Sequence, residues 1–215
     1  MTINFFGKVN NLSNNLISQR FNKYGLTGCL NFYKSSFEQT MIKSNNGLCE
    51  DNVNIVNSFG FIKSINIKNA FSDGVDIDFS NLVIETLDIL ESGNDCLDLS
   101  AGTYEILTAN LSRCKDKGLS IGEKSILTGK NITVKDSNIG VSIKDFSKSF
   151  INTYKGYNVN ICAEAMQKKQ EFGGAIAKFI SKDCNAIYKN DLNSIIQWVL
   201  EKKKNIKWLI ANKEF

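Results

Sequence analysis

Three aspartates have the type and spacing that chemistry would need: Asp76, Asp78 and Asp98. Asp76 and Asp78 are two residues apart, and Asp98 follows Asp76 by 22 residues. Clustered carboxylates can hold Ca²⁺ through oxygen ligands, or one can keep a proton and act as a general acid beside an ionised partner. Lys144 is a candidate base for an elimination reaction. These four are candidate catalytic residues, and the three aspartates are also candidate calcium ligands.

A second set of charged residues supplies candidates for ligand binding. These are Asp116, Lys117, Glu123 and Asp145, which come after the three aspartates in the chain. Lys117 is also an alternative to Lys144 as a cation that would neutralise an acidic sugar.

The composition excludes several classes of mechanism. The chain has 215 residues with 0 His, which rules out an imidazole base or a His-ligated zinc within it. Lys and Arg total 26 against 22 Asp and Glu, and Arg occurs only as Arg20 and Arg113. No basic stripe with interleaved aromatic residues is present, so nucleic acid is not an expected partner. A mean hydropathy of −0.18 and the lack of a long apolar stretch predict no membrane span.

The six cysteines form no CxxC pair and no zinc-like spacing. We expect them to be buried free thiols, because they are scattered through apolar segments. The N-terminal residues lack the basic and apolar regions of a signal peptide. The location therefore stays open: the cell surface or outside the cell if the chain is part of a longer protein, and the cytoplasm if Met1 is the natural start.

A 22-residue repeat positions the charged residues. Six segments, each starting 22 residues after the one before, share one pattern. They read EDNVNIV from Glu50, SDGVDID from Ser72, NDCLDLS from Asn94, DKGLSIG from Asp116, NIGVSIK from Asn138 and NICAEAM from Asn160. The fourth and sixth places are apolar and their neighbours are mostly polar, which is typical of a strand with one face in the core.

A second apolar-alternating run lies between successive segments, as in Ile62, Ile65 and Ile67. A unit of two such strands buries its apolar face only by stacking on copies of itself. We therefore predict an all-β fold, a single-stranded right-handed parallel β-helix with about 22 residues per coil and at least seven coils. We favour it over a leucine-rich repeat, which has a helix or loose arc where this chain has a short strand such as VDID.

The two ends of the chain depart from the repeat. We assign residues 1–25 to an N-terminal cap or partial coil and residues 26–185 to the β-helix. We assign residues 186–215 to an amphipathic C-terminal helix that caps the solenoid, because Ile195, Val199 and Leu209 belong to a set with helical spacing. Asp191 or Asn193 would cap its start.

Equal places in successive segments form columns, because neighbouring coils lie about 4.8 Å apart. The second place reads Asp51, Asp73, Asp95 and Lys117, which predicts turn-forming carboxylates that cap backbone amides and end in an Asp95–Lys117 ion pair. Glycines at the third place are expected to allow a tight or positive-φ corner. These glycines are Gly74, Gly118 and Gly140.

The fifth place brings Asp76 next to Asp98. Such a like-charge pair is disfavoured unless a cation, a proton or a nearby Lys offsets it. A mid-strand position needs no carboxylate for its geometry, so this pair is a stronger functional candidate than the turn aspartates.

The segments resemble the right-handed parallel β-helix proteins of the pectate-lyase-like superfamily, and more closely a poorly characterised subgroup. The motifs that carry this resemblance are ED-x-hydrophobic-N from Glu50, SD-x-x-D-x-D from Ser72, ND-x-x-D-x-S from Asn94, DK-x-x-S-x-GE from Asp116 and G-x-x-x-KD from Gly140. The resemblance covers about residues 25 to 180 and implies relatives associated with cell surfaces or polysaccharides, without an established activity. It suggests a truncated or degenerate member.

We expect a binding or structural module that presents a polar, acidic face to a polysaccharide or to a cell-surface protein. It would require no cofactor, although calcium is possible. The alternative is a polysaccharide lyase or glycoside hydrolase that uses the clustered carboxylates. A rigid spacer within a larger surface protein is the second alternative.

Overall fold

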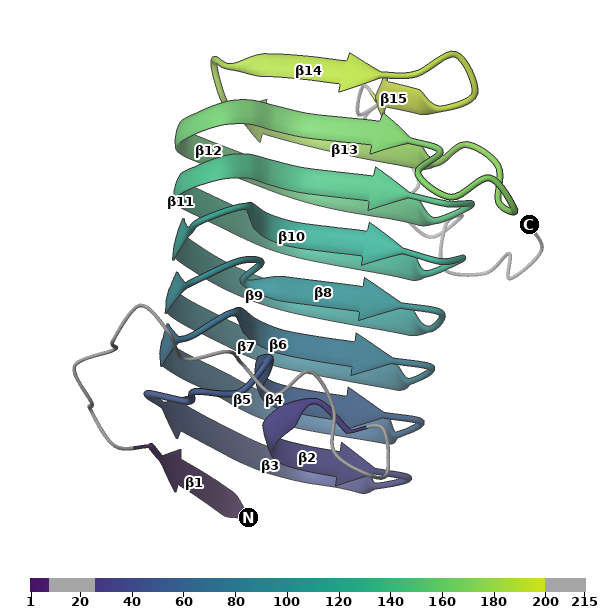
Figure 1. Cartoon of the computed structure of the whole chain (residues 1–215). Coiled ribbons are helices and arrows are strands. Elements are labelled where there is room, and N and C mark those ends of the chain that lie inside the picture. Colours follow the sequence, from purple (N-terminus) through teal and green to yellow (C-terminus); the bar gives the residue numbers. More distant parts are fainter. Residues whose placement is uncertain (8–25, 200–215) are drawn as a thin grey trace, which may run out of the picture.

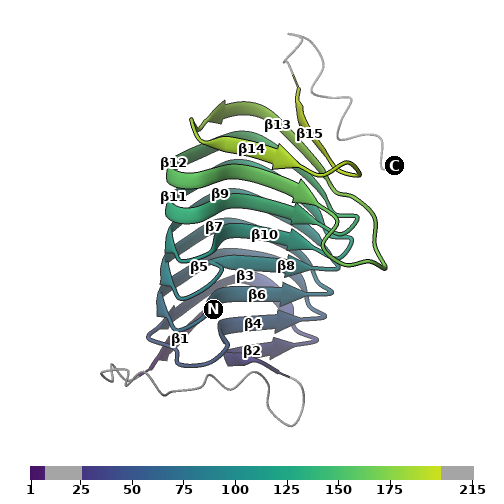
Figure 2. The same ribbon diagram turned by 45° about the horizontal axis from the view of Figure 1, so that its top comes forward.

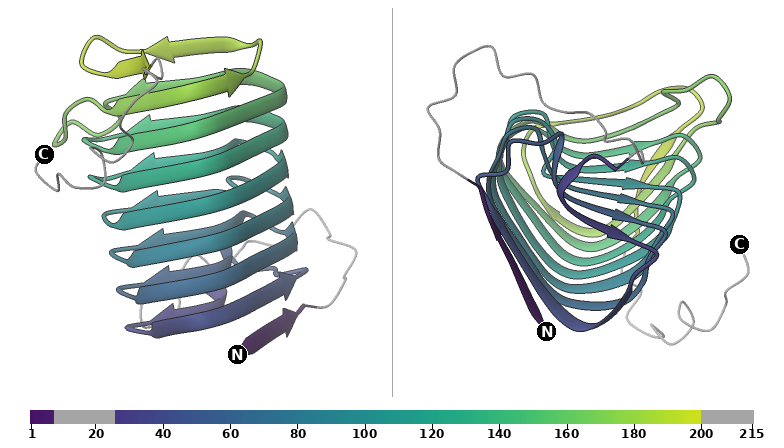
Figure 3. Two further views of the ribbon diagram at one scale, coloured as in Figure 1. Left: turned by 180° about the vertical axis from the view of Figure 1, so that it is seen from behind. Right: turned by 60° about the horizontal axis from the view of Figure 1, so that its bottom comes forward.

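The structure is a computed structural model that describes residues 1–7 and 26–199, and within these ranges it contains fifteen strands and no helix. All strand pairs are parallel and belong to one continuous sheet that winds into a solenoid (Figure 1). The coils lie directly behind one another when the molecule is seen nearly along its axis (Figure 3, right). The predicted all-β parallel solenoid with about 22 residues per turn is confirmed, and it has about eight turns.

Each coil contributes one short and one long strand. The short-strand sheet consists of β2 (Gly28–Tyr33), β4 (Asp51–Val56), β6 (Asp73–Asp78), β8 (Leu97–Ser100), β10 (Lys117–Gly122) and β14 (Ile187–Asn190). The long-strand sheet consists of β1 (Thr2–Phe6), β3 (Ser36–Asn45), β5 (Phe59–Ala70), β7 (Asn81–Ser92), β9 (Thr103–Cys114), β13 (Ile176–Asp183) and β15 (Ile195–Trp198). Two strands run through both sheets, β11 (Ile126–Lys144) and β12 (Lys148–Met166).

The core is filled by the apolar places that the sequence predicts to point inward. From β4 to the end of β12, both apolar places of the short strands are at most 1% exposed. The second apolar run is equally buried, as Ile62, Ile65 and Ile67 show. The 22-residue register places like residues on top of each other, for example Val53 on Val75, so the core consists of stacked aliphatic side chains.

The coil reverses at two corners, where non-glycine residues adopt positive φ. The first corner, from the short to the long strand, has them at Lys34, Asn57, Phe79, Ala101, Glu123, Lys124, Asp145 and Phe146. The second corner, where the long strand ends, has them at Asn46, Asn69, Glu91, Arg113, Asp136 and Asn158. Asparagine and aspartate tolerate this conformation best, and they occupy most of the second corner.

The third-place glycines do not serve the purpose that we predicted. Among the described glycines only Gly60 has a positive φ, so Gly74, Gly118 and Gly140 are not required by backbone conformation. They are required for space instead. A Cβ at Gly118 would lie 2.5 Å from Val134 Cγ1, and one at Gly140 would collide with the Tyr154 hydroxyl.

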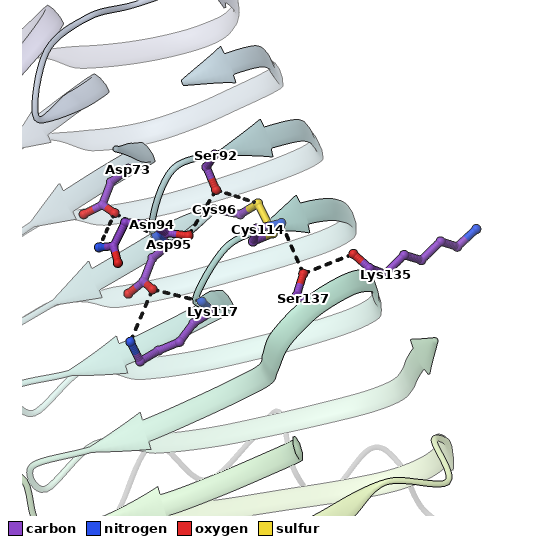
Figure 4. Close-up of a disulfide and its surroundings, with 9 residues drawn as sticks. All are labelled: Asp73, Ser92, Asn94, Asp95, Cys96, Cys114, Lys117, Lys135 and Ser137. Carbon is purple, nitrogen blue, oxygen red and sulfur yellow. Dashed lines mark hydrogen bonds and ion pairs between the residues drawn. A yellow bond between two sulfur atoms is a disulfide. The ribbon is translucent and has the colours of Figure 1, made fainter. Parts of the chain in front are cut away.

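The cysteines are not free thiols, so that prediction is wrong. They form three disulfides, Cys29–Cys49, Cys96–Cys114 and Cys162–Cys184. Each joins the third place of a repeat segment to a residue at or after the end of the long strand in the same coil, near the second corner, as Figure 4 shows for Cys96–Cys114. The bridges therefore recur every three coils, and they lie near both ends and in the middle of the described solenoid. Paired thiols are typical of oxidising compartments.

The C-terminal helix is wrong for residues 187–198, which form β14 and β15. Ile195–Trp198 pairs in register with Ile176–Phe179 of β13. The free edge of β13 offers unpaired backbone groups, and this segment satisfies them by forming a further parallel strand. Asp191 accepts hydrogen bonds from the Gln167 and Asn193 amides and forms a turn rather than a helix cap. Figure 2 shows these strands at the C-terminal end of the solenoid. Residues 200–215 of the predicted helix lie outside the described residues, as do residues 8–25 of the predicted N-terminal cap.

Candidate functional site

A column of polar side chains runs along the outer face of the short-strand sheet. Strand register places these residues in consecutive coils, at the fifth place of each segment. The column, called the polar column below, consists of Asn31, Asn54, Asp76, Asp98, Ser120, Ser142, Glu164 and Lys189. Its members therefore repeat with the spacing of the coils, about 4.8 Å.

Side chains in the C-terminal half of the polar column have hydrogen-bond or ion-pair partners within the chain. Lys144 Nζ donates to Ser120 Oγ at 2.7 Å, and Ser142 Oγ donates to Glu164 Oε1 at 2.8 Å. Lys189 Nζ lies 3.6 Å from Glu164 Oε2. Lys144 and Glu164 are only 7% and 4% exposed, so their charges are shielded from water and held by these partners. This half of the column is a satisfied polar network.

The middle of the polar column is not satisfied in this way. Asp76 and Asp98 are register partners on β6 and β8, and Asp78 lies two residues from Asp76 on the same face. We call Asp76, Asp78 and Asp98 the acidic patch. All three are half-buried, and within residues 1–7 and 26–199 no Lys or Arg nitrogen lies within 4.0 Å of their carboxylates.

Two oxygens at the acidic patch are buried without a hydrogen-bond partner in the described part of the chain. One is Asp98 Oδ1 and the other is Asn54 Oδ1. Asn54 is 1% exposed, and its Nδ2 donates to Asp76 Oδ2 at 3.2 Å, so this side chain is directed toward the patch. A buried acceptor without a donor is costly, and it indicates that a proton, a water molecule or a ligand group belongs there.

The electrostatics of the acidic patch favour bound protons. Burial raises the pKa of Asp76 well above its ordinary value, and the charges of Asp78, Asp51 and Asp98 raise it further. Burial and the charge of Asp98 raise the pKa of Asp78 to about 6, although a hydrogen bond with Asp76 acts in the opposite direction. Both shifts make Asp76 and Asp78 bind a proton more readily than an exposed aspartate does.

Two of the second-place aspartates, Asp73 and Asp95, cap backbone amides as the sequence predicts. Asp73 Oδ1 accepts hydrogen bonds from the Asp95 amide at 2.8 Å and from Asn94 Nδ2 at 2.7 Å (Figure 4). Asp95 Oδ1 accepts from the Lys117 amide at 3.0 Å, and Lys117 Nζ lies 3.3 Å from the same oxygen. The predicted Asp95–Lys117 ion pair is therefore confirmed. Burial, aided by neighbouring acidic charges, raises the pKa of both Asp51 and Asp73 to about 7.

The candidate binding residues have partners within the chain. Lys117 also pairs with Asp116. Burial raises the pKa of Asp116, but the hydrogen bond and charge of Lys117 outweigh burial and lower it. Glu123 pairs with Lys169, and Asp145 Oδ1 accepts from the Lys168 and Lys169 amides at 2.7 and 2.8 Å. Glu123 and Asp145 thus anchor the loop after β12.

At four other places on the solenoid, an aspartate is stacked on an asparagine. Four asparagines donate Nδ2 to an aspartate of the coil before, at distances from 2.7 to 3.4 Å. The pairs are Asn94–Asp73, Asn110–Asp88, Asn138–Asp116 and Asn158–Asp136. The second-place column also stacks carboxylates, as Asp51 on Asp73, but backbone amides at the turns donate to Asp73 and Asp95. The Asp76–Asp98 pair lies in the middle of a strand, where no turn geometry requires a carboxylate.

Exposed aromatic rings border the acidic patch at the first corner. Phe79 directly follows Asp78 and is 61% exposed. Phe59 is 58% exposed and is the register partner of Asn81, so it lies at the same corner one coil away. Tyr33 is 55% exposed and occupies the place equivalent to Asp78 two coils toward the N-terminus. Sequence analysis missed this rim, although a phenylalanine at a polar corner was a visible signal.

The predicted catalytic and metal-binding residues are brought together in part. Asp76, Asp78 and Asp98 are neighbours, whereas Lys144 reaches Ser120, one coil beyond Asp98. Within the described ranges, no group of three His, Cys, Asp or Glu side chains is arranged to hold a metal ion. Calcium binding by the acidic patch would need its carboxylates to close around the ion, and it stays a prediction.

The fold and site define a parallel β-solenoid in which three coils contain a disulfide and the short-strand sheet carries a half-buried acidic patch. No family model, curated protein or solved structure matches the chain. Across residues 1–7 and 26–199 there is no helix that is long and apolar enough to cross a membrane.

Proposed function

We propose that this protein is a glycan-binding module that holds an extended polysaccharide against the acidic patch and its aromatic rim. The observation that carries the proposal is the Asp76–Asp98 contact, in which two half-buried carboxylates are neighbours and no Lys or Arg of residues 1–7 and 26–199 lies within 4.0 Å of them. Such a pair costs stability, so a scaffold built only for stiffness has no reason to keep it.

The aromatic rim supports a sugar as the ligand. Saccharide sites combine a few polar groups with an apolar surface on which a ring can lie, and Phe59 and Phe79 supply that surface beside Asp78. Exposed aromatic side chains that gather at one corner mark an interaction site. A solenoid also presents its columns in a straight row, which suits an extended polymer.

The disulfides support a location outside the reducing cytoplasm. All six cysteines are paired in the structure. Such bridges persist in secreted and surface-exposed proteins, where polysaccharides are the common extended polymers. We therefore propose a secreted or cell-surface role.

The enzyme alternative rests on a specific observation, the carboxyl pair of Asp76 and Asp78. Asp76, whose pKa is raised well above its ordinary value, can keep and donate a proton near neutral pH while Asp78, with a pKa of about 6, is ionised. This arrangement would suit a glycoside hydrolase. A lyase is less well supported, because Lys144 is bound to Ser120 rather than directed at the acidic patch.

The test is a binding and product-release assay with oligosaccharides of neutral, acidic and amine-bearing sugars. We expect binding without new sugar ends, and we expect Phe79→Ala to weaken it about tenfold. Tyr157→Ala is the matched control, because Tyr157 is an exposed aromatic residue of the long-strand sheet. New sugar ends that vanish in Asp78→Asn would establish the enzyme instead. No binding to any oligosaccharide would refute the proposal and leave a rigid spacer.

A further inference from the structure

We infer that the glycan held at the acidic patch carries amino groups, as in a polymer of deacetylated amino sugars, rather than carboxylates. This inference rests on the proposed function and specifies its ligand. It follows from three features of the patch: its charge, its limited exposure, and the buried hydrogen-bond acceptors at Asp98 and the neighbouring Asn54 that have no donor within the described residues.

The charge of the patch selects a cationic group. Asp76, Asp78 and Asp98 gather three carboxyl groups, and within the described ranges no Lys or Arg lies within 4.0 Å of them. A uronate would bring a further negative charge to this place and would be repelled. A neutral sugar would leave the carboxylates without a counter-charge. An ammonium group offsets the repulsion between Asp76 and Asp98 directly.

The limited exposure of the patch suits a small pendant group. Asp76 and Asp98 are half-buried, whereas their neighbours in the polar column on either side, Asn54 and Ser120, are at most 1% exposed. Between Asn54 and Glu164 the column therefore reaches solvent at two adjacent coils only, which lie about 5 Å apart. A primary amine is small enough to approach both carboxylates, while the sugar ring would lie on Phe79.

The acceptors inside the patch match the donors of an ammonium group. An ammonium group has three N–H donors and no acceptor. Asp98 Oδ1 and Asn54 Oδ1 are buried acceptors without a donor in the described part of the chain. Lys144 satisfies Ser120 at the C-terminal border of the patch in the same chemical way, through Nζ at 2.7 Å. The amine of the ligand would do for Asp98 what Lys144 does for Ser120.

The protons that the patch holds give the inference a second readout. Burial and neighbouring acidic charges raise the pKa of Asp76 and Asp78, so an ammonium group that enters the patch would lower these pKa values again and favour release of bound protons. Binding of an amino sugar should therefore release protons into the buffer. Binding through hydroxyl groups alone would leave the protons in place.

The experiment compares three hexasaccharides by calorimetry at pH 6.5: glucosamine, N-acetylglucosamine and galacturonate. We expect the glucosamine hexamer to bind at least about tenfold more tightly than its acetylated form, because a charge-assisted hydrogen bond is lost on acetylation. Repeating the titration in two buffers of different ionisation enthalpy should show net proton release. Asp98→Asn should weaken the binding about tenfold, and Asp88→Asn, on the other sheet, should not change it.

Each other outcome has a separate meaning. Equal binding of the acetylated hexamer, or tighter binding of galacturonate, with loss of either in Phe79→Ala, overturns the amine inference and leaves the glycan-binding module intact. Equal binding of oligolysine that persists in Phe79→Ala overturns it as well, because the patch would then select charge alone. Failure of all three hexasaccharides to bind overturns the inference and the proposed function together.

Discussion

One coil of the solenoid carries two outward-facing aspartates that have opposite surroundings. Asp88, on the long-strand sheet, accepts a hydrogen bond from Asn110 of the next coil at 2.8 Å. Asp76, on the short-strand sheet of the same coil, has Asp98 as its neighbour in the next coil. Both positions recur in every coil, so each aspartate has a neighbour at the equivalent place of the next coil. The two sites differ in the type of that neighbour, which is an asparagine beside Asp88 and an aspartate beside Asp76.

This contrast separates structural from functional polar columns. Stacking an amide on a carboxylate satisfies both groups and needs nothing from outside the chain. Stacking two carboxylates leaves acceptors without donors, and they need a proton or a ligand. The solenoid has the first arrangement at four Asp–Asn pairs. The second-place column stacks aspartates as well, but there backbone amides and Lys117 donate to Asp73 and Asp95, whereas Asp98 Oδ1 in the acidic patch has no donor in the described part of the chain.

The largest expected effect that distinguishes the two sheets is the pH dependence of stability. The pKa values of Asp51 and Asp73 are raised to about 7 and that of Asp78 to about 6 in the folded state. Between about pH 4 and pH 7 the folded state therefore binds more protons than the unfolded state, and the free energy of unfolding falls as the pH rises. We expect Tm to fall by about 10 °C from pH 4.5 to pH 7.5 in thermal unfolding.

Variants locate the source of this pH dependence. Replacing Asp51, Asp73 and Asp78 together by Asn should flatten the dependence of Tm on pH, whereas Asp88→Asn should leave it as it is. A wild-type Tm that rises or stays level over this pH range would mean that these carboxyl groups titrate normally in the folded protein.

Lys117 gives the next largest effect, because it neutralises one member of the turn ladder. Its side chain is 14% exposed and that of Asp95 is 5% exposed, so Lys117→Met leaves a buried carboxylate without its cation. We expect a loss of about 2 to 4 kcal/mol at pH 7.5, measured by denaturant unfolding. Adding Asp95→Asn should recover most of the loss. If the single and double variants are equally unstable, the ion pair does not explain the effect.

Asp76→Asn should stabilise the protein at neutral pH. The substitution removes a carboxyl group that Asp78, Asp51 and Asp98 repel, and it keeps an oxygen that can accept from Asn54. We expect a gain of about 1 kcal/mol or more at pH 7.5, which corresponds to roughly 2 to 4 °C in Tm. The gain should vanish at pH 4.5, where the wild-type group is protonated. Destabilisation at both pH values would contradict the account.

The smallest effect comes from copying the acidic contact onto the long-strand sheet. Asn110→Asp places a carboxylate next to Asp88 on an exposed face, where water screens the repulsion. We expect a loss of about 0.2 to 1 kcal/mol at pH 7.5, and the loss should disappear in 1 M salt. A loss that survives high salt would show that the amide–carboxylate stack itself, rather than charge, stabilises the column.

The sequence predicts most of the solenoid because its repeat is strict. The 22-residue spacing and the alternation in segments such as VDID give the strand register directly, and the columns of Asp73 and Asp95 follow from that register. The Asp76–Asp98 contact was predictable for the same reason. Its burial was not, because the depth of an outward-facing side chain depends on the neighbours that flank it.

The disulfides show what the repeat alone leaves out. Cys29, Cys96 and Cys162 are spaced by 67 and 66 residues, close to three coils, and this regularity was visible in the sequence. Their partners lie across the second corner, so pairing them requires knowing where the coil bends. The C-terminal strands were missed because a short apolar run such as IIQW fits a helix or a strand, and the edge of β13 decides between them.

Asp98→Asn, with stability and glycan affinity measured on the same sample, tests the central claim most directly. If the Asp76–Asp98 contact is kept for a ligand at the expense of stability, the variant should have a higher Tm at pH 7.5 and weaker binding of the glycan that the wild type binds. An unchanged or lower Tm together with unchanged affinity would show that the acidic patch is only part of the scaffold.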